Sequence, residues 1–137
     1  ARALGGKVGP GAGVEIGLTS LDLTDAGRAD PCLGGFPDPF DAVEWHGEGI
    51  TVPPGAEVLA SSPLFPVQAI RYGSHAYGLL FHLEADEQAI ATLCRKCPED
   101  VAKAGLSEDQ VMAGVRDRLE PLQQRAREFL LALIGAS

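Results

Sequence analysis

The sequence predicts an α/β domain, because two stretches of different character follow one another along its 137 residues. Residues 7–84 hold short apolar runs separated by glycine and proline, a pattern typical of strands and turns. In residues 85–137, apolar side chains recur every three or four positions, which is typical of helices. Hydrophobic residues make up 45% of the chain, which is enough to build a core.

The first stretch contains five predicted strands. They are expected near residues 14–23, 42–45, 57–61, 67–71 and 76–82. The last two are expected to form a hairpin through residues 72–75. The run that ends at His82 is almost entirely apolar, which favours a strand buried on both faces.

Helices are predicted at both ends of the chain. Residues 1–6 resemble the last turn of a helix closed by glycine. Residues 86–97 form a helix ahead of Pro98, and a capping box over residues 107–110 opens another helix that runs toward Ile134. Pro121 is expected to kink or interrupt it, because proline removes a backbone donor and clashes with the preceding turn.

Charge and apolar content exclude two classes of function. Acidic residues outnumber basic ones 19 to 11, and no lysine or arginine lies between Arg28 and Arg71, so a nucleic-acid groove is not expected. The longest apolar stretch, residues 129–134, is far shorter than the roughly 18 residues of a transmembrane helix, so no membrane span is expected. Three cysteines without a signal peptide favour the cytoplasm.

A histidine and a glutamate in i, i+2 spacing follow the last apolar run. In an extended chain such side chains share a face, with Cα atoms about 6.5 Å apart, so His82 and Glu84 can touch. A carboxylate that accepts from one imidazole nitrogen fixes the tautomer and leaves the other nitrogen free to take a proton. The pair is therefore a candidate base with its orienting residue, although the same spacing is common in pairs without a catalytic role.

The cysteines offer neither a nucleophile nor a metal site. Cys32 lies in a loop without the strand and helix of a nucleophile elbow. Cys94 and Cys97 have a chelating spacing, but a structural zinc needs four ligands and no second pair follows. We therefore expect ordinary reduced thiols, no metal and no cofactor.

Ordered blocks of this sequence resemble those of the class I glutamine amidotransferases, the Cys-His-Glu enzymes that release ammonia from glutamine. Residues 78–84 resemble the Gly-x-Gln-Phe-His-Pro-Glu block. Residues 15–17 resemble the Glu-x-Gly strand, residues 45–48 the His-Gly-Asp/Glu turn, and residues 52–62 the Leu-Pro-x-Gly and Leu-Ala-x-Ser stretch. Residues 68–70 resemble the Gln-Ala-Phe strand. The chain is most similar to domains related to the amidotransferase half of GMP synthase.

This resemblance implies a class I glutamine amidotransferase-like fold, a flavodoxin-like three-layer α/β sandwich. Residues 1–137 would be the C-terminal part of a single domain, with strands and loops over 1–84 and helices over 85–137. The nucleophilic cysteine would precede Ala1 by about ten residues, on a strand-to-helix elbow. We expect the missing N-terminal half to come from the same protein or its place to be taken by self-association, because open strand edges and apolar faces are costly.

The resemblance also implies the site and the reaction. His82 would be the base, Glu84 its orienter and Glu15 a structural hydrogen-bond acceptor. The residues beside the glutamine substrate would be Trp45, His46, Gly47 and Glu48, whose backbone groups hold its amino and carboxylate groups. The thiolate would attack the side-chain amide, ammonia would leave, and water would hydrolyse the thioester to glutamate. The chain alone is expected to be inactive.

Two positions depart from the family pattern. Leu80 replaces a glutamine, which removes a polar side chain near the site, and Leu83 replaces a proline and is expected to point away from it. Two alternatives therefore stay open. One is a non-catalytic relative whose pocket binds an amino acid or a partner protein, and the other is a γ-glutamyl peptidase-type hydrolase. An amidotransferase would have an ammonia-accepting synthetase as its partner.

Overall fold

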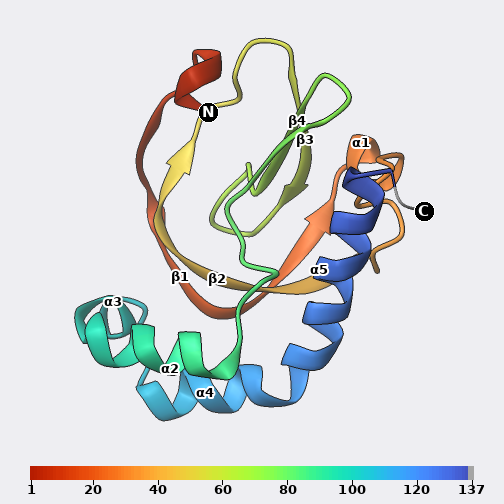
Figure 1. Ribbon diagram of the computed structural model, residues 1–137. Coiled ribbons are helices and arrows are strands. Elements are labelled where there is room, and N and C mark those ends of the chain that lie inside the picture. The colour runs from red at the N-terminus through yellow and green to blue at the C-terminus, as the bar shows by residue number, and fades with distance from the viewer. Residues whose placement is uncertain (136–137) are drawn as a thin grey trace.

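Two long antiparallel strands form the base of the fold. In the computed structural model, which describes residues 1–135, β1 (Val8–Leu23) and β2 (Phe40–Ile50) curl together around the remaining strands (Figure 1). The end of β1 leaves β2 and pairs with β3 (Ala56–Ser61), followed by β4 (Ala69–Tyr72) and β5 (Ala76–Leu79). The sheet order is β2-β1-β3-β4-β5, and every pairing among these strands is antiparallel.

Side chains alternate across β1 and β2 and so supply two cores. On the inner side of the curled sheet, Leu21 and Phe40 pack with the β3–β5 strands and helix α5 (Leu119–Leu133). On the outer side, Ile16 and Val43 pack with the helices α2 (Glu87–Lys96), α3 (Pro98–Lys103) and α4 (Glu108–Val115). This alternation decides which face of β2 each candidate site residue occupies.

The predicted helices are present, with differences at the breaks. The helix over residues 86–97 is α2 (Glu87–Lys96), capped by Asp86. The capping box of Ser107 and Gln110 opens α4 (Glu108–Val115), a short 3-10 turn η2 (Arg116–Arg118) follows, and α5 begins at Leu119. The interruption therefore precedes Pro121, which sits in the first turn of α5, where a missing backbone donor is tolerated.

The remaining helical segments are short. At the start of the chain lies η1 (Arg2–Leu4), a 3-10 turn closed by Gly5 at φ 87°, so the glycine cap over residues 1–6 is confirmed. Two helices were not predicted. These are α1 (Asp25–Arg28), capped by Thr24, and α3 (Pro98–Lys103), which starts with proline. Both are single or short turns without apolar periodicity.

The strands differ from prediction at β1, which begins at Val8 rather than near residue 14, and at β2 and β5. The predicted strand over residues 42–45 extends to Ile50, so residues 45–48 lie in a strand and the predicted turn there is wrong. The glycine-rich start of β1 allows this, because it pairs with the end of β2 beyond an irregularity between Pro10 and Glu15. The expected hairpin at residues 72–75 is confirmed.

Strand β5 ends at Leu79, before the predicted end at His82. It was expected to be buried on both faces, but it is half-buried at best along its length. The reason is its position, because within residues 1–135 it pairs only with β4 and lies at the sheet edge.

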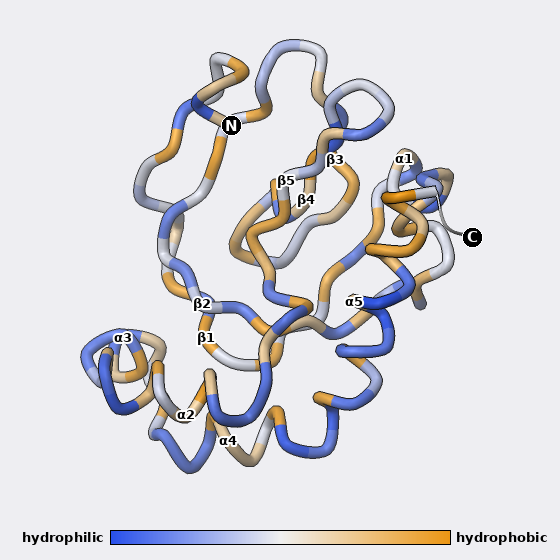
Figure 2. Tube along the Cα trace, viewed as in Figure 1, coloured by the Kyte–Doolittle hydropathy of each residue, from blue (hydrophilic) through white to orange (hydrophobic). Residues whose placement is uncertain are grey.

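Among residues 1–135, no helix has the length and apolarity to cross a membrane. Figure 2 shows apolar and polar residues alternating along the helices, as expected for helices with one buried face.

Candidate functional site

His82 and Glu84 follow β5 and are in contact. The backbone N–H of His82 donates to the Val43 carbonyl at 2.7 Å, which forms an isolated bridge to β2. His82 Nδ1 lies 2.8 Å from Glu84 Oε1. The two side chains are 40% and 75% exposed, respectively. The structure therefore anchors the histidine through its backbone and leaves the paired side chains open to solvent.

The contact fixes which ring nitrogen of His82 faces solvent as the acceptor. A short contact from Nδ1 to a carboxylate places the ring proton on Nδ1 and leaves Nε2 as the basic nitrogen. Burial alone would raise the pKa of Glu84, but the hydrogen bond from His82, with those from nearby backbone amides, lowers it below its ordinary value. Glu84 thus stays ionised and acts only as an acceptor.

Trp45, His46, Gly47 and Glu48 line one pocket of about 510 Å³. The same pocket is lined by Asp100 and Lys103 of α3, which form an ion pair at 3.3 Å. Trp45 packs against the outer core, and its indole Nε1 is buried without a hydrogen-bond partner. The pocket therefore offers charges of both signs beside β2.

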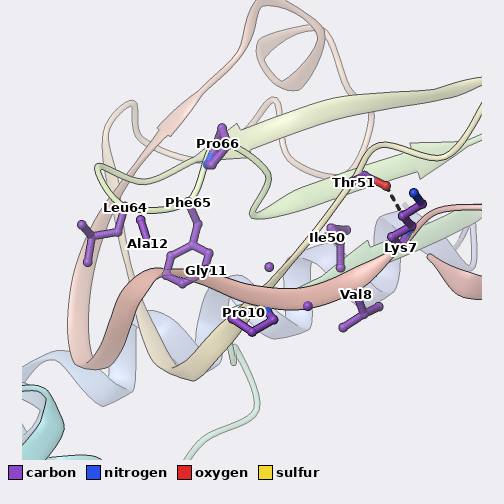
Figure 3. Close-up of a pocket in the computed structure, with 12 residues that line it drawn as sticks. Lys7, Val8, Pro10, Gly11, Ala12, Ile50, Thr51, Leu64, Phe65 and Pro66 are labelled. Carbon is purple, nitrogen blue, oxygen red and sulfur yellow. Dashed lines mark hydrogen bonds between the residues drawn. The ribbon is translucent and has the colours of Figure 1, made fainter.

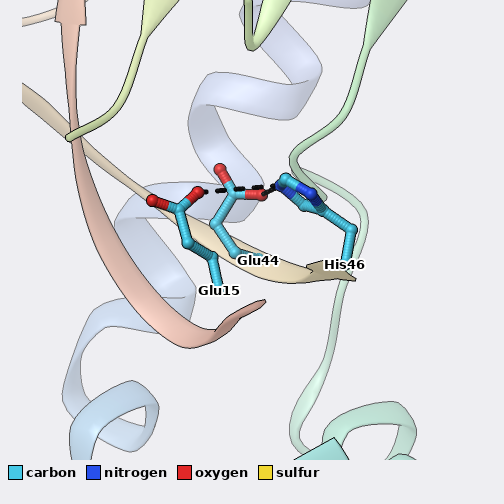
Figure 4. A group of neighbouring side chains, drawn as sticks. All are labelled: Glu15, Glu44 and His46. Carbon is cyan, nitrogen blue, oxygen red and sulfur yellow. Dashed lines mark ion pairs between the residues drawn. The ribbon is translucent and has the colours of Figure 1, made fainter. Parts of the chain in front are cut away.

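A second histidine–glutamate pair lies on the inner face of β2 (Figure 4). His46 Nε2 is 2.8 Å from Glu44 Oε2 and 3.7 Å from Glu15 Oε2. Its other nitrogen, Nδ1, is 3.0 Å from the Glu48 carbonyl oxygen. Glu44 is fully buried, and the short contact lacks hydrogen-bond geometry, so both Glu44 oxygens remain without a hydrogen-bond partner.

Glu15 is a buried hydrogen-bond acceptor, as expected of it. It accepts from Ser62 Oγ at 2.9 Å and from Gln68 Nε2 at 2.6 Å, so it joins β1 to the segment between β3 and β4. Glu44, in contrast, was not predicted from the sequence. The signal was present, because Glu44-x-His46 has the same i, i+2 spacing as His82-x-Glu84.

The buried pair shifts both of its partners toward their protonated forms. Burial is the main cause that raises the pKa of Glu44, and the contact with His46 only partly opposes it. Burial lowers the pKa of His46, but the contact with Glu44 outweighs this, and the pKa is raised overall. Both groups therefore keep their protons to a higher pH than their solvated counterparts do.

Other residues singled out from the sequence lie away from this chemistry. Cys32 and Cys94 are buried, Cys97 is half-buried, and His75 is exposed in the β4–β5 hairpin. Leu83 is buried in the inner core and so points away from the exposed His82 and Glu84 side chains.

A further groove of about 480 Å³ runs along the start of β1 and the end of β2 (Figure 3). Phe65 covers it from above Gly11, where a Cβ atom would lie 2.1 Å from the Phe65 ring. The lining is mostly apolar, and two hydrogen bonds join Lys7 to Thr51 across it, from the Lys7 backbone N–H to Thr51 Oγ1 at 2.9 Å and from the Thr51 backbone N–H to the Lys7 carbonyl at 2.9 Å. It contains none of the predicted site residues.

Comparison with known proteins places this arrangement in a family. No family model matches the chain. It is 32% identical over 103 residues to the glutamine amidotransferase-like protein YfeJ of Salmonella typhimurium, in an alignment that covers 75% of this chain and 43% of YfeJ. It is 34% identical over 86 residues to a glutamine-hydrolysing GMP synthase subunit of Thermococcus kodakarensis, in an alignment that covers 61% of this chain and 44% of that protein.

The fold agrees with the sequence comparison. A glutamine amidotransferase from Methylobacillus flagellatus superposes with a TM-score of 0.88 over 98% of this chain and 57% of its own, at 24% identity. The chain spans less than half the length of both of these curated relatives. The resemblance inferred from ordered motifs and the expected fold class are confirmed, and the chain belongs to the class I glutamine amidotransferase family.

Proposed function

We propose that this chain contributes the base and its orienting carboxylate to a glutaminase site that hydrolyses the side-chain amide of glutamine to glutamate and ammonia. The observation that carries the proposal is the 2.8 Å contact between His82 Nδ1 and Glu84 Oε1, on a histidine whose side chain is open to solvent. The chain belongs to the amidotransferase family, and this membership supports glutamine hydrolysis as the reaction of the pair.

In the proposed reaction His82 acts twice. Its Nε2 accepts the proton of a cysteine thiol and then donates it to the departing ammonia, while the sulfur forms a thioester with the glutamyl group. The same nitrogen next accepts a proton from water, which attacks the thioester and releases glutamate. Glu84 stabilises the imidazolium that forms at both steps.

The cysteine is proposed to lie outside this sequence. Cys32 and Cys94 are buried, and Cys97 caps α2 in the outer helical layer. Among the described residues, the only side chain that hydrogen-bonds His82 is Glu84. We accordingly propose that residues 1–137 are the C-terminal part of one domain whose other part brings the nucleophile and its oxyanion donors.

The pocket beside β2 is the proposed place for the glutamine head group. Trp45, His46, Gly47 and Glu48, the proposed substrate-binding residues, line it, and Lys103 adds a positive charge. One of the relatives is itself a subunit of a glutamine-hydrolysing GMP synthase. We therefore also propose that the ammonia is passed to a synthetase partner.

The test is glutamate release from glutamine by the protein that carries this sequence, with and without substitution of His82. His82→Ala is expected to lower kcat by about a thousandfold or more, because loss of one member of such a triad removes most of the catalysis. His75→Ala, at the exposed hairpin, is the matched control and is expected to keep full activity. Near-normal turnover by a folded His82→Ala protein would contradict the proposal and favour a binding module.

A further inference from the structure

The inner face of β2 holds two buried carboxyl groups that the proposed reaction does not use. Glu15 and Glu44 are 6% and 0% exposed, and His46 is the only cationic partner of either among the described residues. Burying two carboxylates is costly unless hydrogen bonds or cations compensate them. Glu15 has two donors, but both Glu44 oxygens have none. Glu44 is therefore buried without hydrogen-bond compensation.

A second observation points to the same place. Gln68 is fully buried, and its Nε2 contacts Glu15 and lies 3.4 Å from His46 Nε2. Its amide oxygen Oε1 has no hydrogen-bond partner. Unpaired buried oxygens on both Glu44 and Gln68, two residues that contact His46, are unusual, because native structures leave few such groups unpaired.

We propose that Glu15, Glu44 and His46 bind a zinc ion. Their ligand atoms all lie within 4.8 Å of one another. Zinc bonds of about 2.0–2.2 Å in a tetrahedral site separate neighbouring ligand atoms by roughly 3.3–3.5 Å. The distances from His46 Nε2 to the two carboxylates, 2.8 and 3.7 Å, lie on either side of that value. Small shifts of the His46 ring and the two carboxylates would therefore bring these distances to the zinc value.

A hydrogen bond at Nδ1 orients the His46 ring for metal binding through Nε2. The Nδ1–H donates to the Glu48 carbonyl, which fixes the tautomer and leaves Nε2 directed at the two carboxylates. A backbone carbonyl on the second nitrogen is the usual outer partner of a metal-binding histidine. A water molecule would supply the fourth ligand, because the Gln68 amide nitrogen already donates to Glu15 at 2.6 Å and to Ser62 at 3.0 Å.

The types of ligand atom indicate which ion binds, and their positions indicate what the ion does. One imidazole with two carboxylates suits zinc, whereas magnesium and calcium prefer oxygen ligands alone. The ion would join β1 and β2. It would lie beside Val43, whose carbonyl holds the His82 backbone, and so would stiffen the strand that anchors the proposed base.

Thermal unfolding of the chelator-treated protein tests this inference. Zinc is expected to raise Tm by roughly 5–10 °C at saturating concentration, because an ion that binds only the folded state stabilises it. An equal concentration of magnesium is expected to have no effect. Glu44→Gln keeps the shape of the side chain and is expected to abolish the zinc response.

Cys97→Ala is the matched control, because Cys97 lies with Glu99 and Asp100 in a separate group of metal-binding side chains. This variant is expected to keep the full zinc response. A response lost in Cys97→Ala but kept in Glu44→Gln would place the ion on α3 and overturn the proposal. The absence of any zinc response in the unsubstituted protein would overturn it too.

Cobalt absorption provides a measurement that does not depend on stability. Substituted cobalt is expected to show the visible bands of a tetrahedral site without the thiolate charge-transfer band that a cysteine ligand produces. Glu15→Gln provides a second variant if Glu44→Gln fails to fold, and it is expected to remove the bands. Cobalt bands that survive Glu15→Gln, or that include thiolate charge transfer, would exclude this cluster.

Discussion

Two histidine–glutamate pairs of the same chemistry and the same spacing occupy opposite environments in this molecule. In the pair that follows β5, the His82 and Glu84 side chains are 40% and 75% exposed. In the pair on β2, the His46 and Glu44 side chains are 12% and 0% exposed. Each pair has a nitrogen–oxygen distance of 2.8 Å. The distance is therefore the same, but the contact of His82 is a hydrogen bond through Nδ1, whereas that of His46 is made through Nε2 without hydrogen-bond geometry, and burial and neighbours also differ.

The comparison shows that environment decides what such a pair can do. Solvent and substrate can reach the exposed pair, so protons can enter and leave through its free nitrogen. The buried pair shares its space with Glu15 and Gln68 and cannot exchange protons with a substrate without opening the core. Catalysis is thus proposed for the first pair and metal binding for the second.

The largest effect expected from this contrast is catalytic. In the protein with measurable glutaminase activity, Glu84→Gln should lower kcat by roughly a hundredfold or more, because the amide neither steadies the imidazolium nor enforces the tautomer. The unfolding free energy should change by less than about 1 kcal/mol, since the carboxylate is exposed. Steady-state kinetics and urea unfolding measure the two quantities. A loss of stability that parallels the loss of activity would refute the distinction.

The next effect concerns the stability that Glu15 contributes beside the buried pair. Glu15→Ala, measured in chelator, should lower the unfolding free energy by about 2–4 kcal/mol, because Ser62 and Gln68 lose their acceptor inside the core. Glu84→Ala is the comparison and should cost no more than about 1 kcal/mol. Urea unfolding of both variants under one condition provides the measurement. Equal losses of unfolding free energy in the two variants would mean that burial does not distinguish the two sites.

The smallest effect is a change in titration at the exposed pair. NMR of the Glu84 carboxyl should show a pKa below its ordinary value near 4.5, and His82→Gln should return it toward that value. Because the folded-state pKa is lowered, the stability that this contact contributes is present above pH 4.5 and is lost as pH falls through the lowered pKa. Solvent screening keeps that contribution small. An unchanged pKa in His82→Gln would assign the shift to the backbone amides instead.

Local patterns were sufficient where neighbouring residues alone decide the structure. The capping box of Ser107, the glycine turn of the β4–β5 hairpin and the contact of His82 with Glu84 each involve residues within four positions of one another. Their geometry follows from backbone period and side-chain reach. The family was also readable, because several motifs occur in the right order.

Local patterns could not predict how strands that are distant in the sequence pair with one another. The extension of β2 to Ile50 depends on the glycine-rich start of β1, more than thirty residues earlier, and the edge position of β5 depends on the order of the whole sheet. A periodicity of two does not specify which strand lies alongside. The turn expected at residues 45–48 was wrong for this reason.

The sequence by itself therefore determined the fold class, the family and the spacing of both histidine–glutamate pairs. Only the tertiary structure decided that one pair is open and the other buried. Burial arises from the curl of β1 and β2, which carries Glu15, His46 and Gln68 to one point from three separate segments. The physical reason is that spacing is a property of the local backbone, whereas solvent exposure and charge balance depend on every segment that packs nearby.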